Sequence, residues 1–112
     1  MKVNNLPDGL LVVVKRECET CVEIEPAIRE IAAAGPLTVA SQDDASFPSG
    51  LDVLDDTDLD LSWTLQTEVT PTLYRIHEGA VEQLAVGWRR ADWRDHTGLD
   101  DLGAELPEHR PG

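Results

Sequence analysis

The chain has 112 residues, 41% of them hydrophobic, and its 22 acidic against 9 basic side chains give a formal net charge of −13. This length fits one domain with a buried core, because compact domains commonly have about 100 to 150 residues. The negative charge opposes binding to nucleic acid and to anionic membranes. No stretch resembles a signal peptide or reaches about 18 uninterrupted apolar residues, so we expect a cytoplasmic protein without a membrane partner.

The N-terminal part of the chain predicts a strand. Residues 1–9 form a lead-in, which the turn-forming sequence Pro7-Asp8-Gly9 closes. A strand at about 10–15 follows, because Leu10 to Val14 are consecutive apolar residues rich in β-branched side chains. Such a run is typical of a strand that is covered on both faces.

A helix is predicted next, from near Cys18 to about Ala34, where Gly35-Pro36 ends it. Pro26 removes one hydrogen bond inside this helix and is expected to kink it. Leu37 to Ser41 form a second short apolar strand. The order strand, helix, strand predicts a right-handed parallel crossover.

The middle of the chain is acidic. Residues 42–58 are expected to form a solvated loop; a cation site near Asp56, Asp58 and Asp60 is the less favoured alternative, since the glycine and distal glutamate of a calcium loop are missing. Residues 57–66 fit either of two elements. Their alternating apolar side chains favour a strand, whereas Thr57 followed by Asp60 resembles a helix capping box.

The C-terminal third predicts a hairpin and a helix. A strand at 69–76 is entered through Pro71, and the Glu78-Gly79 turn joins it to a second strand at 80–86, which Gly87 closes. A helix from Arg90 to about Thr97 follows, with Trp93 expected to pack on the sheet. Trp63 is also expected in the core. The final residues read as a tail or linker.

Cys18 and Cys21 are the only cysteines, and they lie where the first strand gives way to the first helix. A helix N-terminus favours a thiolate, lowering a cysteine pKa from about 8.5 to roughly 3.5 to 7.5. The second cysteine is about one helical turn further along and within reach of a mixed disulfide on the first. Redox chemistry is therefore the favoured interpretation.

Metal binding and inert structural thiols remain open as alternatives for this pair. Tetrahedral zinc needs two further ligands, and His77, His96 and His109 have no ligand spacing to the cysteines. We therefore predict no metal site within one chain, and surface or packing roles for the histidines.

The order of elements and five local features together resemble the thioredoxin family over roughly residues 10–98. These features are Cys18-Glu19-Thr20-Cys21, Pro26, Val69-Thr70-Pro71-Thr72, Gly79 and Gly87. The resemblance implies an α/β fold with a central four-stranded mixed sheet flanked by about three helices, in the order βαβαββα. It also implies that residues 57–66 are helical, with 1–9 a lead-in and 99–112 a tail or linker outside the domain.

The same resemblance implies the roles of the site residues. Cys18 would attack a substrate disulfide and the buried Cys21 would resolve the product, so the redox-active pair itself replaces any cofactor. Pro71 would follow a cis bond and bring Thr70 beside the dithiol, where its backbone would pair with an extended substrate segment. Substrate contacts are expected at Thr70, Pro71, Glu19, Thr20 and Gly87.

The sequence departs from the usual family pattern close to the cysteines. Glu17 replaces the usual tryptophan, Glu19 and Thr20 replace Gly-Pro, and Val12 replaces a buried aspartate. Carboxylates beside a thiol oppose its ionisation. We therefore expect a pair that reduces its substrates rather than one that oxidises them.

Two functions follow as hypotheses. The first is a thiol-disulfide oxidoreductase of cell redox homeostasis, with disulfide-containing substrates and an unidentified reductant as partners. The second is a docking or electron-delivery module for a fused or partner enzyme, suggested by the linker-like residues Pro107 to Gly112. Arg89, near the groove rim on the thioredoxin pattern, is a possible contact for an acidic partner, although solvation of the last helix is the favoured interpretation.

Overall fold

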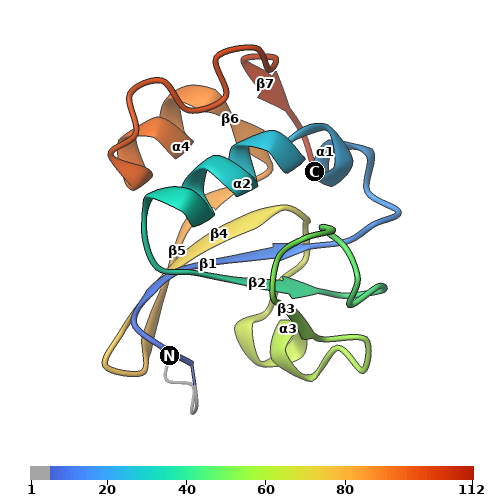
Figure 1. Cartoon of the computed structure of the whole chain (residues 1–112). Helices are drawn as coiled ribbons and strands as arrows, with labels where there is room; N and C mark the ends of the chain where they lie inside the picture. Colours follow the sequence, from blue (N-terminus) through green and yellow to red (C-terminus); the bar gives the residue numbers. More distant parts are fainter. Residues whose placement is uncertain (1–5) are drawn as a thin grey trace.

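A computed structural model describes residues 6–112 and has a mixed α/β architecture built on one main sheet (Figure 1). In chain order the elements are β1 (Gly9–Val14), α1 (Glu19–Glu23), α2 (Glu25–Ala34), β2 (Leu37–Ser41), β3 (Val53–Asp55), α3 (Asp60–Leu65), β4 (Thr72–His77), β5 (Ala80–Val86), β6 (Trp88–Arg89), α4 (Arg90–Thr97) and β7 (His109–Arg110). The main sheet has the order β3-β2-β1-β4-β5. β1, β2 and β3 are mutually parallel, and β4 is antiparallel to both β1 and β5.

β1 is the central strand, and its apolar run supplies the core on both faces of the sheet. Val12 and Val14 pack with side chains of α2 and α4, whereas Leu11 and Val13 pack on the other face with Leu65 of α3. Figure 1 shows the same layers, with α2 and α4 on one face and α3 on the other. These four side chains are fully buried, as the sequence predicted for a strand covered on both faces, whereas Leu10 at the start of the run is partly exposed.

The helix predicted from Cys18 to Ala34 is two helices, α1 and α2, rather than one kinked helix. The break is at Ile24, whose ψ of 6° leaves the helical region and whose carbonyl accepts from the amides of Ala27 and Ile28. Pro26, which has no N–H to donate, lies in the first turn of α2, where none is needed. The described chain therefore has four helices instead of about three.

The sheet has five strands instead of the predicted four, because β3 forms inside the acidic connection. Val53 pairs in parallel with Val39, and Asp55 pairs with Ser41 at the edge of the sheet. A strand of only three residues among acidic side chains is too short to show the alternating hydrophobic pattern from which a strand is predicted. The strand depends on the exposed edge of β2, which only the folded structure supplies.

Residues 60–65 are helical, but a capping box does not hold α3. The buried carboxylate of Asp56 instead accepts from the amides of Leu61 and Ser62, at 2.8 and 3.0 Å, and from the Ser62 hydroxyl. The expectation that Trp63 belongs to the core is wrong: the residue is 86% exposed. The short helix turns Leu65 toward the sheet and Trp63 away from it.

The segment after α4, expected as a tail or linker, folds back onto the domain. Leu102 is buried, and the Trp88 indole N–H donates to the carbonyl of Pro107 at 2.8 Å. β7 pairs with β6, placing His109 opposite Arg89. Trp88 and Trp93 are both fully buried beneath this segment, with ring centroids 5.2 Å apart. The C-terminus consequently lies beside α1 (Figure 1).

Candidate functional site

The two cysteines lie at the end of β1, where the chain turns into α1. The Cys18 amide donates to the carbonyl of Lys15, which closes the turn, and Cys18 is the N-cap residue of α1. Its sulfur accepts a hydrogen bond from the Cys21 amide at 3.2 Å. Both cysteines are free thiols. The turn therefore holds the Cys18 sulfur over the first turn of α1.

Burial separates the two thiols. Cys18 is half-buried, whereas Cys21 has no exposed surface and belongs to the core that α2 and α4 share with the sheet. Loss of solvation by burial, reinforced by a hydrogen bond with Cys18, raises the pKa of Cys21 well above its ordinary value of 9.0. Within the pair, an external reactant can reach Cys18 more readily than Cys21.

The loop before β4 approaches the dithiol from a distant part of the chain. The Cys18 thiol donates to the carbonyl of Thr70 at 3.3 Å, and the Thr70–Pro71 peptide bond is cis. The Pro71 carbonyl accepts from the amide of Gly87 at 2.8 Å. Gly87 has a φ of 71°, which favours glycine. The fold thus brings Thr70 beside Cys18, and Gly87 is joined to this loop through its hydrogen bond to Pro71.

The residues between the cysteines have different surroundings. Glu19 is exposed and lines a hollow of about 440 Å³ together with Lys15, Glu17, Cys18 and Thr70. Thr20 lines the same hollow but is buried, and its hydroxyl donates to the carbonyl of Pro111 at 2.7 Å. Its hydroxyl is therefore engaged within the chain.

Residues 110–112 also line this hollow, and sequence reasoning missed them. A Cβ added to Gly112 would clash with the carbonyl oxygen of Thr70, so the segment lies close to the loop before β4. Pro111 and Gly112 are typical of linkers in a sequence, and nothing in their local pattern indicates a contact with residue 70. Their position depends on the pairing of β7 with β6.

Part of the acidic connection holds the turn that leads into the dithiol. The Asp43 carboxylate accepts from the backbone amides of Arg16 and Glu17, at 2.7 and 3.1 Å. Hydrogen bonds from Ser46 and the guanidinium of Arg16 hold the pKa of Asp44 down to about 2. Asp43 and Asp44 therefore hold the turn between β1 and Cys18 in place through Arg16 and Glu17.

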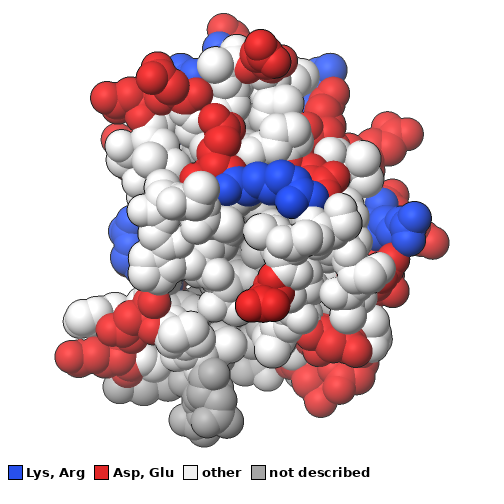
Figure 2. Space-filling view, viewed as in Figure 1, with Lys and Arg blue, Asp and Glu red and all other residues white. Residues whose placement is uncertain are grey.

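Acidic side chains are spread widely over the face of the molecule seen in Figure 2, and basic side chains are few. Within residues 6–112, no three His, Cys, Asp or Glu side chains converge in a group able to hold a metal ion. The carboxylates of Asp56 and Asp58 accept hydrogen bonds from nearby backbone amides instead.

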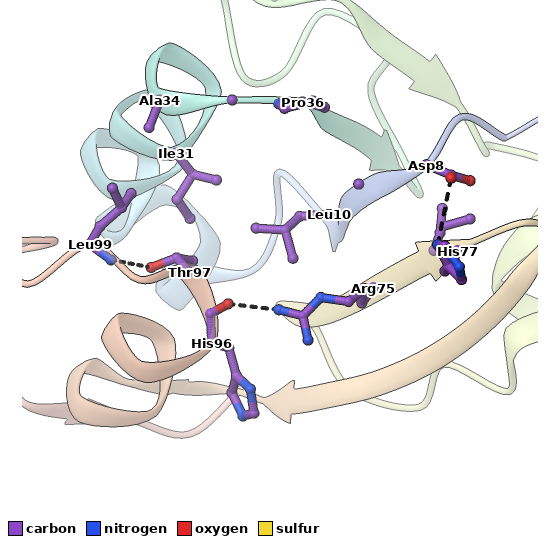
Figure 3. Close-up of a pocket in the computed structure, with 13 residues that line it drawn as sticks. Asp8, Leu10, Ile31, Ala34, Pro36, Arg75, His77, His96, Thr97 and Leu99 are labelled. Atoms are coloured by element: carbon purple, nitrogen blue, oxygen red, sulfur yellow. Dashed lines mark hydrogen bonds and ion pairs between the residues drawn. The ribbon is translucent and has the colours of Figure 1, made fainter.

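A second hollow lies at the opposite end of β1, and Figure 3 shows its lining. Arg75 donates to the carbonyl of His96 at 2.8 Å, and His77 lies 3.7 Å from a carboxylate oxygen of Asp8. Leu10, Ile31 and Leu99 form apolar walls. None of the residues predicted for the site lines this hollow.

The chain matches no protein-family model, and a search of curated proteins finds none similar to it. Among the helices of residues 6–112, none has the length and apolar content that crossing a membrane requires.

Proposed function

We propose that this chain is a thioredoxin-like thiol-disulfide oxidoreductase that reduces disulfides through Cys18. The observation that carries the proposal is the placement of one half-exposed sulfur between two backbone groups. The Cys18 sulfur lies 3.2 Å from the Cys21 amide and 3.3 Å from the Thr70 carbonyl, and Cys21 is buried behind it. This arrangement gives the pair one reachable thiol and one protected thiol.

The order of the elements supports the thioredoxin-like assignment. A dithiol between β1 and α1, a parallel β1–β2 pair, a cis-proline entry to β4 and an antiparallel β4–β5 hairpin occur in the sequence expected from the resemblance. The edge strand β3, the break between α1 and α2, and the returning C-terminal segment are additions to that pattern.

The proposed reaction has two exchange steps. The Cys18 thiolate attacks one sulfur of a substrate disulfide, forming a mixed disulfide and releasing the other sulfur as a thiolate. Cys21 then attacks the Cys18 sulfur, and the second substrate sulfur leaves. The proton that Cys21 gives up is balanced by protonation of a released thiolate. Two electrons pass from the dithiol to the substrate, and a separate thiol reductant must restore the pair.

The charges near Cys18 support reduction as the direction of the reaction. Glu17 and Glu19 are exposed at the same hollow as the sulfur, and Lys15 and Arg110 are the basic residues that line it. Carboxylates oppose a neighbouring thiolate, and a less stabilised thiolate makes a dithiol a stronger reductant. The substrate is expected to carry an accessible disulfide.

A redox titration of Cys18 and Cys21 in defined thiol buffers, read by the mass shift after alkylation, tests this function. We expect one two-electron transition near or below about −230 mV, in the range of dithiols that act as reductants. A transition near about −120 mV would reverse the proposed direction. Thiols that fail to pair, or that hold stoichiometric metal in the same sample, would overturn the function.

A further inference from the structure

The chain's own C-terminal segment lies across the surface that a substrate would approach. Arg110, Pro111 and Gly112 line the hollow beside Cys18, together with Glu19 and Thr20. The Pro111 carbonyl accepts from the Thr20 hydroxyl at 2.7 Å. Gly112 packs against Val69 and Thr70, which leave no room for an added Cβ. The segment therefore bridges α1 and the loop before β4.

One charged contact anchors this segment. The Arg110 guanidinium lies 2.9 Å from the carboxylate of Glu23 at the end of α1. Glu17 and Glu19 also line the hollow near α1, against Lys15 as the single basic residue besides Arg110, so acidic side chains predominate there. A basic side chain is the charge that complements this surface.

The contacts of the segment are superficial. Arg110, Pro111 and Gly112 are all exposed, and the side chains of Arg110 and Glu23 retain 50% and 38% of their exposure. Exposed ion pairs contribute little to stability. The segment can therefore leave the surface by opening the two-residue β6–β7 pairing at Arg110, while the buried anchors of the preceding chain, Leu102 and Gly103, stay in place.

We propose that the surface formed by Thr20, Glu23 and Thr70 docks an extended protein segment carrying a basic side chain, and that Arg110–Gly112 occupies it until such a substrate displaces them. The inference rests on the function proposed above and specifies its substrate class. The chain's own segment is an extended piece with one arginine, seated where the partner would lie. While the segment occupies the surface, a substrate cannot bind there. The apparent affinity for the substrate is therefore the intrinsic affinity multiplied by the fraction of molecules in which the surface is free.

Two synthetic peptides test the inference on the full-length chain. Each carries a single cysteine linked to thionitrobenzoate, flanked either by lysines or by glutamates. Attack of the Cys18 thiolate on the peptide sulfur forms the mixed disulfide and releases thionitrobenzoate, whose absorbance gives the rate. The variants are Arg110→Ala and Glu23→Gln. Arg75→Ala and Glu82→Gln make the same charge changes on other exposed parts of the molecule.

We expect the lysine peptide to react about tenfold faster than the glutamate peptide at low salt. Because the net charge of −13 attracts any cationic peptide, the deciding quantity is how each variant changes that ratio. Glu23→Gln is expected to lower the ratio severalfold and Glu82→Gln to leave it unchanged. Arg110→Ala is expected to raise both rates severalfold, and Arg75→Ala to leave them unchanged.

The failures of the two proposals are distinguishable. The docking inference would be overturned if Glu23→Gln did not change the ratio of the two peptide rates, or if Arg110→Ala did not change the rates themselves. Exchange at Cys18 would still stand in either case. Absence of exchange with both peptides in every variant would overturn the oxidoreductase function instead. In that case, faster labelling of Cys18 by a bulky maleimide in Arg110→Ala would still support the segment as a cover, and equal labelling would overturn it.

Discussion

The Thr20 hydroxyl donates a 2.7 Å hydrogen bond to the carbonyl of Pro111, a residue 91 positions later in the chain. Thr20 lies between the two cysteines, and Pro111 lies in the segment that crosses the hollow beside them. This one contact links the dithiol helix to the end of the sequence. The docking inference therefore predicts that the conformation of the C-terminal segment and the accessibility of Cys18 are coupled.

Thr20→Val removes this hydrogen bond while keeping the shape of the side chain. We expect a loss of about 0.5 to 1 kcal/mol in the free energy of unfolding, because the exposed Pro111 carbonyl can bond to water instead. Cys18 should also be labelled faster by a bulky maleimide. Urea unfolding and labelling followed by mass spectrometry measure the two effects. Thr64→Val is the control, since the hydroxyl of Thr64 bonds only within α3, to Asp60; equal effects of the two variants would contradict the coupling.

Replacing Cys21 by serine should trap the first step of the proposed reaction. Cys18 remains able to attack a substrate disulfide, but no thiol is left to release the mixed disulfide. We expect Cys21→Ser to accumulate covalent complexes with disulfide-containing proteins, seen on non-reducing gels and lost on reduction. Cys18→Ser is the matched control and should form none. Equal trapping by both variants would show that Cys18 is not the specific attacking thiol.

The raised pKa of Cys21 predicts how stability depends on pH. In the folded chain burial keeps this thiol neutral, whereas in the unfolded chain it ionises near its ordinary value of 9.0. The stabilisation is therefore fully present below pH 9 and is lost as the pH rises above it, with a slope of up to about 1.4 kcal/mol per pH unit.

Urea unfolding of the reduced protein between pH 7 and 10.5 measures this slope. Cys21→Ala is the control, because it lacks the titrating thiol but retains Tyr74, whose pKa burial also raises. The wild-type chain should lose stability more steeply than the variant above pH 9. Parallel curves would show that Cys21 is not protected in the folded state.

Asp56→Ala should destabilise the protein far more than a change at a neighbouring aspartate. Asp56 is buried and accepts from two amides and one hydroxyl at the start of α3, so its loss leaves those donors without partners. We expect a cost of about 2 to 3 kcal/mol in unfolding free energy. Asp58→Ala, which removes one exposed contact to the Asp60 amide, should cost less than about 1 kcal/mol. Equal losses in urea unfolding would contradict this role of Asp56.

Much of the local structure could be predicted because its causes are close together in the chain. The apolar run Leu10 to Val14 is a central strand, Gly35 ends α2, and Gly79 lies in the turn between β4 and β5. The spacing of Cys18 and Cys21 at a strand-to-helix corner likewise follows from the residues themselves. Each of these features depends on backbone preferences and periodicity over a few residues.

The tertiary structure decided what depends on residues far apart in sequence. Val53–Asp55 is a strand only because β2 offers an open edge, and Trp63 is exposed because Leu65 fills the place against the sheet. Asp56 holds α3 from outside the helix, and residues 99–112 pack back onto Trp88. Most consequentially, Pro111 reaches Thr20 only after β7 pairs with β6. The sequence by itself placed the dithiol, whereas long-range packing decided what covers it, since those contacts exist only once distant segments meet.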